Sequence, residues 1–182
     1  MHTENEIKVL GIDLKKAEEK LLDLGFKRTE EITYRRYVYD VVPVNPNAWI
    51  RLRTNGKKTT LTFKESLKDS VDGMKEIEVI VDNFDETNEF LKAIGHEPRN
   101  YQENSRVNFE GMNCTISLDS WPQIPPYMEI EADNADDVNK CLEALSELVT
   151  SDTTSLSTEE VYKRYGIDLS SIKELRFDKV AA

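Results

Sequence analysis

Charged residues spaced two apart are the feature of this sequence that most directly suggests chemistry. Three segments carry two acids around one residue, and a fourth carries two arginines in the same way: Glu4 with Glu6, Glu76 with Glu78, Glu129 with Glu131, and Arg51 with Arg53. Side chains alternate between the two faces of a strand, so residues two apart project to the same side. The spacing therefore predicts strands with one charged face and one apolar face.

The same alternation adds further charged residues to these faces, giving seven acids and five bases with a net charge of −2. The acids are Glu4, Glu6, Glu76, Glu78, Asp119, Glu129 and Glu131, and the bases are Lys8, Arg51, Arg53, Lys64 and Arg106. An ordinary antiparallel sheet with one solvated face is the plain alternative. However, neighbouring like charges repel, and a sheet selected only for stability would intersperse them.

The charged set has the chemistry of a site for metal ions and phosphate. Carboxylate oxygens suit Mg²⁺ or Mn²⁺, whereas Arg and Lys side chains suit phosphate oxygens. Such a face must be hydrated, because the desolvation of each unpaired ion costs on the order of several kcal/mol. Two divalent ions would change its charge from −2 to +2 and so match a triphosphate. The residues thus predict a hydrated tunnel that binds a triphosphate with a divalent metal.

Eight strands are expected to position these residues. The strand-like runs are residues 4–10, 32–40, 48–54, 59–65, 74–81, 103–110, 113–120 and 127–133. Asn55-Gly56 and Glu110-Gly111 are the hairpin turn signals. Eight antiparallel strands are enough to curl and close. We therefore predict an α+β fold: a closed eight-stranded antiparallel β-barrel, or tunnel, with a charged polar interior and helices packed outside.

Four amphipathic or capped segments predict the helices. Asp13, Asp85 and Asn134 each begin a segment with apolar residues on one side, and the third extends through Leu148. Ser157 and Glu160 form a capping box for a C-terminal helix at about 157–165. The expected organisation is one domain over residues 1–182, with its core in residues 4–148.

Composition excludes several classes of protein. The chain has 182 residues and a formal net charge of −11, which disfavours a nucleic-acid binder. No apolar run approaches the length of a membrane span. Cys114 and Cys141 have no CxxC spacing, so we expect two buried thiols in a reducing compartment. The sequence predicts a soluble, cytoplasmic protein, either a monomer or a homodimer, with no nucleic-acid or membrane partner.

The N-terminal run Glu4-x-Glu6-x-Lys8 resembles the ExExK signature of the CYTH superfamily. This superfamily comprises the triphosphate tunnel enzymes, which include class IV adenylyl cyclases, thiamine triphosphatases and inorganic tripolyphosphatases. The later elements follow in the family's order over about residues 4–133: Arg51-x-Arg53, Lys64, Glu76-x-Glu78, Arg106, Asp119 and Glu129-x-Glu131.

The resemblance implies a role for each of these residues. The implied metal ligands are Glu4, Glu6, Asp119, Glu129 and Glu131, and the implied phosphate-binding residues are Lys8, Arg51, Arg53, Lys64 and Arg106. Catalysis would involve Glu4, Glu6, Lys8, Glu129 and Glu131. Glu76 and Glu78 would either serve the metal or orient a basic neighbour. Tyr162 and Lys163 are candidates for a C-terminal basic or tyrosine position that some members use.

Three functions are compatible with this residue set. We expect a CYTH-type metal-dependent hydrolase that cleaves a phosphoanhydride bond of tripolyphosphate, ATP or thiamine triphosphate by in-line attack of a metal-held water. A class IV adenylyl cyclase is the first alternative, and it would need a purine pocket; Tyr37, Tyr39, Trp49 and Trp121 are candidates to stack on the base. A non-catalytic polyphosphate- or nucleotide-binding protein is the second. Hydrolysis is preferred because it needs fewer site components: it does not require a purine pocket.

Overall fold

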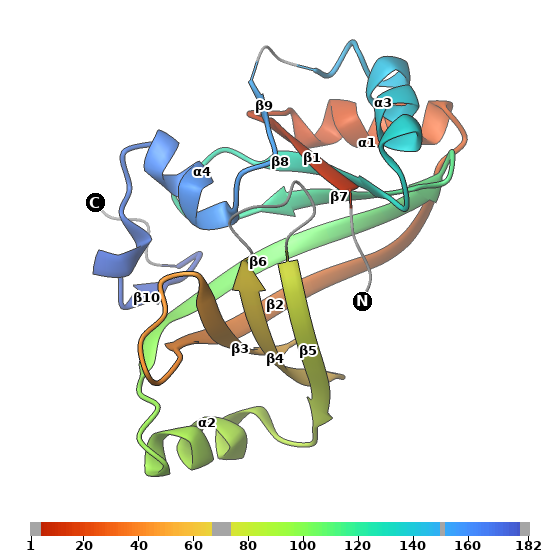
Figure 1. The fold of residues 1–182 in the computed structure, drawn as a ribbon. Coiled ribbons are helices and arrows are strands. Elements are labelled where there is room, and N and C mark those ends of the chain that lie inside the picture. The colour runs from red at the N-terminus through yellow and green to blue at the C-terminus, as the bar shows by residue number, and fades with distance from the viewer. Residues whose placement is uncertain (1–4, 67–73, 150–151, 179–182) are drawn as a thin grey trace. The chain divides into compact units, whose positions relative to one another are not determined.

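The structure is a computed structural model that describes residues 5–66, 74–149 and 152–178 (Figure 1). The strands are β1 (Asn5–Leu10), β2 (Lys27–Asp40), β3 (Ala48–Thr54), β4 (Thr59–Ser66), β5 (Met74–Val81), β6 (Pro98–Gly111), β7 (Cys114–Ser120), β8 (Tyr127–Ala132), β9 (Thr153–Thr154) and β10 (Glu174–Leu175). The helices are α1 (Leu14–Asp23), α2 (Phe84–Ala93), α3 (Ala135–Ala144) and α4 (Thr158–Arg164), with a 3₁₀ turn at Leu169–Ser171. Among the described residues, no helix is both long and apolar enough to span a membrane.

The strands form one mainly antiparallel sheet with the pairing order β5-β4-β3-β2-β6-β7-β8-β1-β9, and β10 pairs in parallel with β6. The α+β class is confirmed. The closed eight-stranded barrel is not, because the pairing order over the described residues is an open path of ten strands that ends at β5 and β9. The two added strands, β9 and β10, lie in segments with no strand-like alternation.

Two compact units divide the chain. The first unit contains Thr33–Asn104 and the C-terminal segment from Ser170, and the second contains the described residues up to Ile32 together with Ser105–Leu169. β2 and β6 are 14 residues long and each continues unbroken from one unit into the other. Both begin earlier than predicted. The exposed run at residues 27–31 has no alternation that would mark it as strand.

The core of the first unit lies between one face of β2–β5 and α2. Tyr39, Leu52, Phe84 and Leu91 are buried there. α2 begins at Phe84, one residue before the predicted Asp85, because the Asn83 side chain accepts hydrogen bonds from the backbone N–H groups of Asp85 and Glu86.

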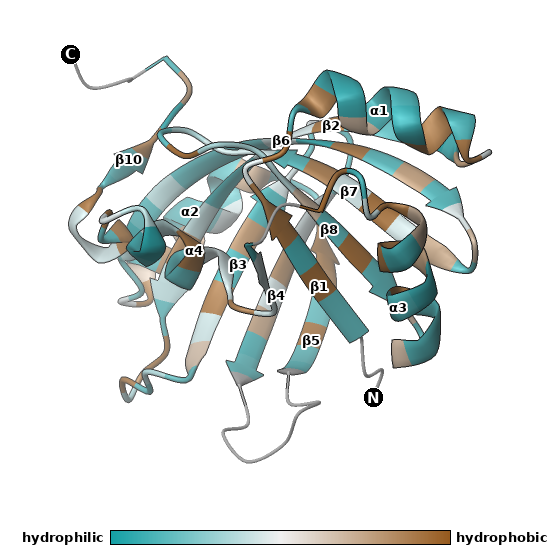
Figure 2. Ribbon diagram, turned by 90° about the horizontal axis from the view of Figure 1, so that it is seen from above, coloured by the Kyte–Doolittle hydropathy of each residue, from teal (hydrophilic) through white to brown (hydrophobic). Residues whose placement is uncertain are grey.

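The core of the second unit lies between the apolar face of its strands and helices α1 and α3. It includes Val9, Leu21 and Met128, together with Cys114 and Cys141 as predicted. The Asp13 and Asn134 helix caps are confirmed, but α3 ends at Ala144, with Leu145 as its C-cap, and not at Leu148 as predicted. Figure 2 shows the result as alternating apolar and polar bands along the strands.

The C-terminal helix is confirmed, whereas one turn lies later than predicted. α4 carries the Ser157–Glu160 capping box. The turn between β6 and β7 is formed by Met112 and Asn113, both at positive φ, whereas Gly111 pairs with Cys114 as part of the sheet. The predicted Glu110-Gly111 turn is therefore wrong by two residues.

Candidate functional site

The strand register of the first unit gathers its basic residues on the polar face of β2–β5. Arg51 lies opposite Thr62, which lies opposite Glu78, and Lys64 lies opposite Glu76. We call the charged residues of this face the basic cluster: Arg36, Arg51, Arg53, Lys64, Glu76 and Glu78. Its four bases and two acids give a formal charge of +2.

The two acids of the basic cluster contact neighbouring polar residues. The Lys64 ammonium group pairs with the Glu76 carboxylate. Thr62, which is fully buried, donates to Glu78 Oε2 at 2.9 Å. Both acids of the basic cluster therefore have a polar partner on the adjacent strand β4.

Sequence reasoning missed Arg36 and Tyr34 on this face. Arg36 pairs directly with Arg53 across β2 and β3 and is buried. The Tyr34 ring lies 4.6 Å from the Arg53 guanidinium carbon and 5.9 Å from that of Arg36. The signal available was the parity of residues 34, 36 and 38, but polar and apolar residues do not alternate cleanly in this run.

The second unit places its charged residues on the polar faces of β1, β6, β7 and β8. We call them the acidic cluster: Glu6, Lys8, Arg106, Asp119, Glu129 and Glu131. Its four acids and two bases give a formal charge of −2. The two units therefore carry polar faces of opposite net charge. Glu4, the remaining predicted ligand, lies outside the described residues.

Lys8 is buried at the centre of the acidic cluster. Its ammonium nitrogen lies 2.6 Å from Glu6 Oε1 and 3.0 Å from Glu129 Oε1. Burial alone would lower the pKa of Lys8, but the carboxylates of Glu129 and Glu6 outweigh that effect and raise it. Lys8 is therefore charged and held by two acids that are predicted metal ligands.

Arg106 closes the other side of the cluster through three short hydrogen bonds. Its Nε and one Nη bind the two carboxylate oxygens of Asp119 at 3.0 and 2.7 Å, and the same Nη donates to Glu129 Oε2 at 2.7 Å. Asp119 is fully buried, with 0% exposure. Arg106, predicted to bind phosphate, is thus held between two carboxylates.

The acids of this cluster differ in their readiness to hold a proton. Burial and the neighbouring carboxylate of Glu129 raise the pKa of Glu6 to about 7, against the opposing effect of Lys8. Burial also acts to raise the pKa of Glu129, but Lys8 and Arg106 overcome it and lower the value to about 2. Glu129 is thus the ionised partner of both bases.

The donor set of the acidic cluster fits a hard divalent cation. Glu6 and Glu131 are directly opposite each other on β1 and β8, and like charges in such a pair repel unless a cation lies between them. Their donors are carboxylate oxygens, which Mg²⁺ and Mn²⁺ prefer. In the arrangement described for residues 5–66, 74–149 and 152–178, no three acidic, His or Cys side chains form a ready metal-binding group.

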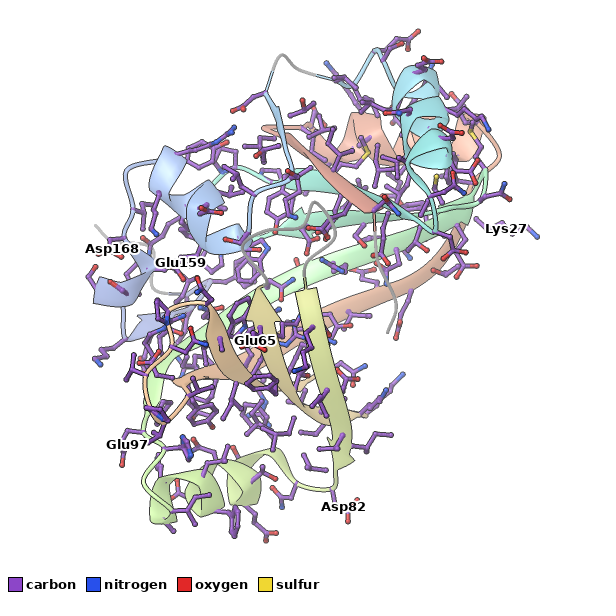
Figure 3. All side chains as sticks on the ribbon, in the orientation of Figure 1. Lys27, Glu65, Asp82, Glu97, Glu159 and Asp168 are labelled. Carbon is purple, nitrogen blue, oxygen red and sulfur yellow. The ribbon has the colours of Figure 1, made fainter. Side chains whose placement is uncertain are left out.

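Neither C-terminal candidate belongs to the clusters. The Tyr162 hydroxyl donates to the Pro122 carbonyl oxygen at 2.7 Å, and its ring packs edge-on against Trp121. Lys163 pairs with Glu159 one turn earlier on α4, at 3.4 Å. Both side chains therefore make contacts with residues outside the two clusters. Other charged residues, such as Lys27, Asp82 and Glu97, are exposed and project outward (Figure 3).

Three of the four aromatic residues considered for base stacking are structural. Tyr39 is fully buried and donates to Asn88, Tyr37 stacks on Phe84 in the same core, and Trp121 packs against Tyr162. Trp49 differs, because it is half-buried on the face of the basic cluster, directly opposite Lys64.

Comparison with known proteins agrees with this arrangement of charged strands. A family model described as the CYTH domain matches residues 2–161. The chain belongs to the CYTH family. No curated protein sequence matches this CYTH chain closely enough to count as a relative.

Solved structures share the CYTH fold at low sequence identity. A conserved hypothetical protein from Pyrococcus furiosus superposes with a TM-score of 0.74 at 20% identity, over 86% of this chain and 98% of that one. A Vibrio parahaemolyticus protein proposed to be an adenylate cyclase gives 0.69 at 16% identity, over 89% and 98%. HpAC1 from Hippeastrum, for which a dominant triphosphatase activity is described, gives 0.65 at 15% identity, over 94% and 100%.

Proposed function

We propose that this CYTH chain is a divalent-metal-dependent enzyme that hydrolyses a phosphoanhydride bond of a triphosphate held in a charged tunnel. The observation that carries the proposal is the presence of two kinds of charged strand face: a basic cluster of +2 on β2–β5 and an acidic cluster of −2 on β1, β6, β7 and β8. Phosphate oxygens and divalent cations are the two ligand classes that these faces suit.

The basic cluster would bind and neutralise the polyphosphate. The guanidinium groups of Arg51 and Arg53 present forked donors that match phosphate oxygens, and Lys64, oriented by Glu76, adds a point charge. Because the donors lie on neighbouring strands of one sheet, their positions are set before the substrate arrives. Their positive charge would stabilise negative charge as the scissile bond breaks.

The acidic cluster would hold the cation. Glu6 and Glu131 would be its main ligands, and Glu129 would keep Lys8 and Arg106 in place at its border. A bound Mg²⁺ or Mn²⁺ would polarise phosphoryl oxygens and lower the pKa of a bound water. Lys8, fixed between two carboxylates, would add a positive charge for the phosphate beside them.

The family relatives support both hydrolysis and a second candidate. HpAC1 is described as dominantly a triphosphatase, and the Vibrio protein as a proposed adenylate cyclase. The position of Trp49 beside Lys64 favours keeping ATP cyclisation as the alternative, since an indole on the phosphate-binding face could stack on a purine. Three of the four aromatic candidates for a purine pocket, Tyr37, Tyr39 and Trp121, instead pack in local structure. Hydrolysis requires no purine pocket and is therefore favoured.

A substrate panel tests the proposal. Purified protein would be given tripolyphosphate, thiamine triphosphate and ATP, each with Mg²⁺ and with Mn²⁺, while released phosphate and cyclic AMP are measured together. We expect metal-dependent phosphate release. Cyclic AMP as the main product from ATP would favour the cyclase, and tight binding with no turnover of any compound would favour a binding protein.

The variant Glu6→Gln tests the proposed role of Glu6 as a metal ligand. The variant keeps the size of the side chain but removes a carboxylate oxygen ligand, so we expect kcat to fall by about a hundredfold or more. The matched control is Glu30→Gln, an exposed residue on β2. Equal activity of Glu6→Gln and the wild type would contradict the assignment.

A further inference from the structure

The first unit carries an apolar surface on β4 and β5, on the side of the sheet opposite the basic cluster. Strand register arranges its residues in two rows: Leu61 on β4 pairs directly with Val79 on β5, and Phe63 pairs directly with Ile77. Because side chains alternate along a strand, these four lie on the face opposite Glu78. The apolar face therefore continues out to β5, which ends the pairing path of the described strands.

Helix α2 covers only the inner part of this apolar face. It follows β5 after two connecting residues, yet its buried side chains pack with Tyr39 and Leu52 on β2 and β3. On β5, Val79 remains 51% exposed and Ile77 remains 58% exposed. An apolar sheet face is normally buried against a second layer of structure, so this part of the sheet has the character of a surface for a further helix beside α2.

An open groove of about 360 Å³ lies between α2 and the end of β5. Leu61 and Val81 line it from the sheet, and Thr87 and Phe90 line it from α2, where residues three apart share one side of the helix. Phe90 is 62% exposed. Single exposed apolar residues are ordinary, but a contiguous apolar surface with a polar rim marks a binding surface.

The rim of the groove is acidic. Asp82 projects outward at the end of β5 (Figure 3), and Glu86 lies in the first turn of α2. Both side chains are exposed, and the described residues that line the groove include these two acids and no base. A second copy of the chain, with a net charge of −11, would bring the same acids to this surface. Charge complementarity therefore favours a basic partner over self-association.

The length of the apolar surface matches a short helix. Four residues of strand separate Ile77 from Val81, which is about 13 Å along β5. About nine helical residues span that distance, or two to three turns. A helix of this length with one apolar side could cover Val79 and Phe90 together.

We propose that the groove between α2 and β5 binds a short amphipathic helix of another protein, apolar on one side and rich in Lys or Arg on its flanks. Its apolar side chains would contact Leu61, Val79 and Phe90, and its basic flanks would lie beside Asp82 and Glu86. The inference goes beyond the proposed function and does not depend on it, because none of these residues belongs to the basic or the acidic cluster.

Synthetic peptides test the groove with the full chain. The first peptide is a helix of about 15 residues with leucines every three or four positions and lysines on the flanks, and the second replaces each lysine by glutamate. In fluorescence anisotropy we expect saturable binding of the basic peptide with a Kd below ~100 µM. The acidic peptide should bind at least about tenfold more weakly. Amide chemical shifts of the labelled protein should change on β4, β5 and α2.

Matched variants separate the groove from general attraction of a basic peptide to an acidic protein. Phe90→Ser should raise Kd about tenfold or more and Val79→Ser about threefold to tenfold, whereas Ile80→Ser, an exposed position on the other face of β5, should stay within about twofold. Glu86→Gln should raise Kd about twofold to fivefold and reduce its salt dependence. Glu97→Gln, an exposed acid outside the groove (Figure 3), should not. Circular dichroism checks that each variant is folded.

Several results would overturn the proposal. No saturable binding of the basic peptide, or equal binding of both peptides, would exclude a basic amphipathic helix as the occupant. Equal effects of Val79→Ser and Ile80→Ser, or shift changes confined to the two charged clusters, would place the peptide elsewhere. If light scattering shows a dimeric wild type and a monomeric Phe90→Ser variant, the surface is an interface between two copies of this chain and the basic partner is wrong.

Discussion

At the scale of single residues, the acidic cluster shows how a charged site is kept folded before its ligands arrive. Asp119 is fully buried and receives two hydrogen bonds from Arg106, which also binds Glu129. A buried ion pair contributes little by itself, but breaking one leaves an uncompensated charge. The pair therefore maintains the structure of the site as well as its charge.

Asp119→Asn should destabilise the protein. The amide removes one of the two carboxylates that bind the Arg106 guanidinium and leaves only Glu129, so we expect the free energy of unfolding to fall by about 1–3 kcal/mol. Urea unfolding, monitored by circular dichroism, measures this free energy. Asp23→Asn, an exposed acid at the end of α1, serves as the control. Equal midpoints for the two variants would show that the buried pair does not stabilise the fold.

The sequence predicted which charged residues share a strand face better than it predicted which residues contact each other. Strand alternation was enough to group Arg51, Arg53 and Lys64 on one face, because each directly follows an apolar residue. It could not find Arg36, since residues 33–38 mix polar and aromatic side chains on both faces. The like-charged Arg36–Arg53 pair depends on the register between β2 and β3, which local sequence does not specify.

At the scale of elements, the β6–β7 hairpin shows a glycine used for close approach instead of turn geometry. Met112 and Asn113 adopt the positive φ values of the turn, at 52° and 57°. A Cβ added to Gly111 would lie 2.7 Å from a ring carbon of Phe26, which is buried in the core of the second unit. The glycine therefore makes room for a core side chain.

Gly111→Ala should destabilise the second unit by overpacking. The added methyl group must displace the Phe26 ring, for which we expect a loss of about 1–3 kcal/mol in thermal or urea unfolding. Phe26→Leu combined with Gly111→Ala is the matched test, because a smaller partner should recover part of the loss. Simple additivity of the two changes would mean that the contact is not the cause.

Elements with a local cause were predicted well, and elements with a tertiary cause were not. The caps at Asp13, Asn134 and Ser157 follow from hydrogen bonds to nearby backbone N–H groups, which sequence spacing reveals. In contrast, β9 and β10 are two residues each and exist through pairing with β1 and β6. Nothing within so short a segment distinguishes it from a loop.

At the scale of the whole molecule, the sequence predicted the fold class but neither the open sheet nor the two compact units. Alternation showed that most strands have two unlike faces, from which the α+β class followed. It could not decide whether the sheet closes, because closure depends on which strands pair at its two ends. It also gave no sign of the two compact units, since β2 and β6 run through both without a break.

Continuous strands predict that the two units unfold together. Trp49 belongs to the first unit and Trp121 to the second, so each can report on its own unit. In urea, the fluorescence of Trp49→Phe and of Trp121→Phe should give coincident midpoints once each variant's own stability change is corrected by circular dichroism. Separated transitions, with one unit melting first, would show that β2 and β6 do not transmit cooperativity.

The two long strands also restrict how such a chain can be dissected genetically. A gene fragment ending near Ile32 or beginning near Ser105 would cut β2 or β6 in mid-strand, leaving unpaired backbone groups at a new edge. Separately expressed halves should therefore aggregate instead of folding. Evolutionary exchange of one half for another is constrained for the same reason, because the junction lies inside hydrogen-bonded sheet and not in a linker.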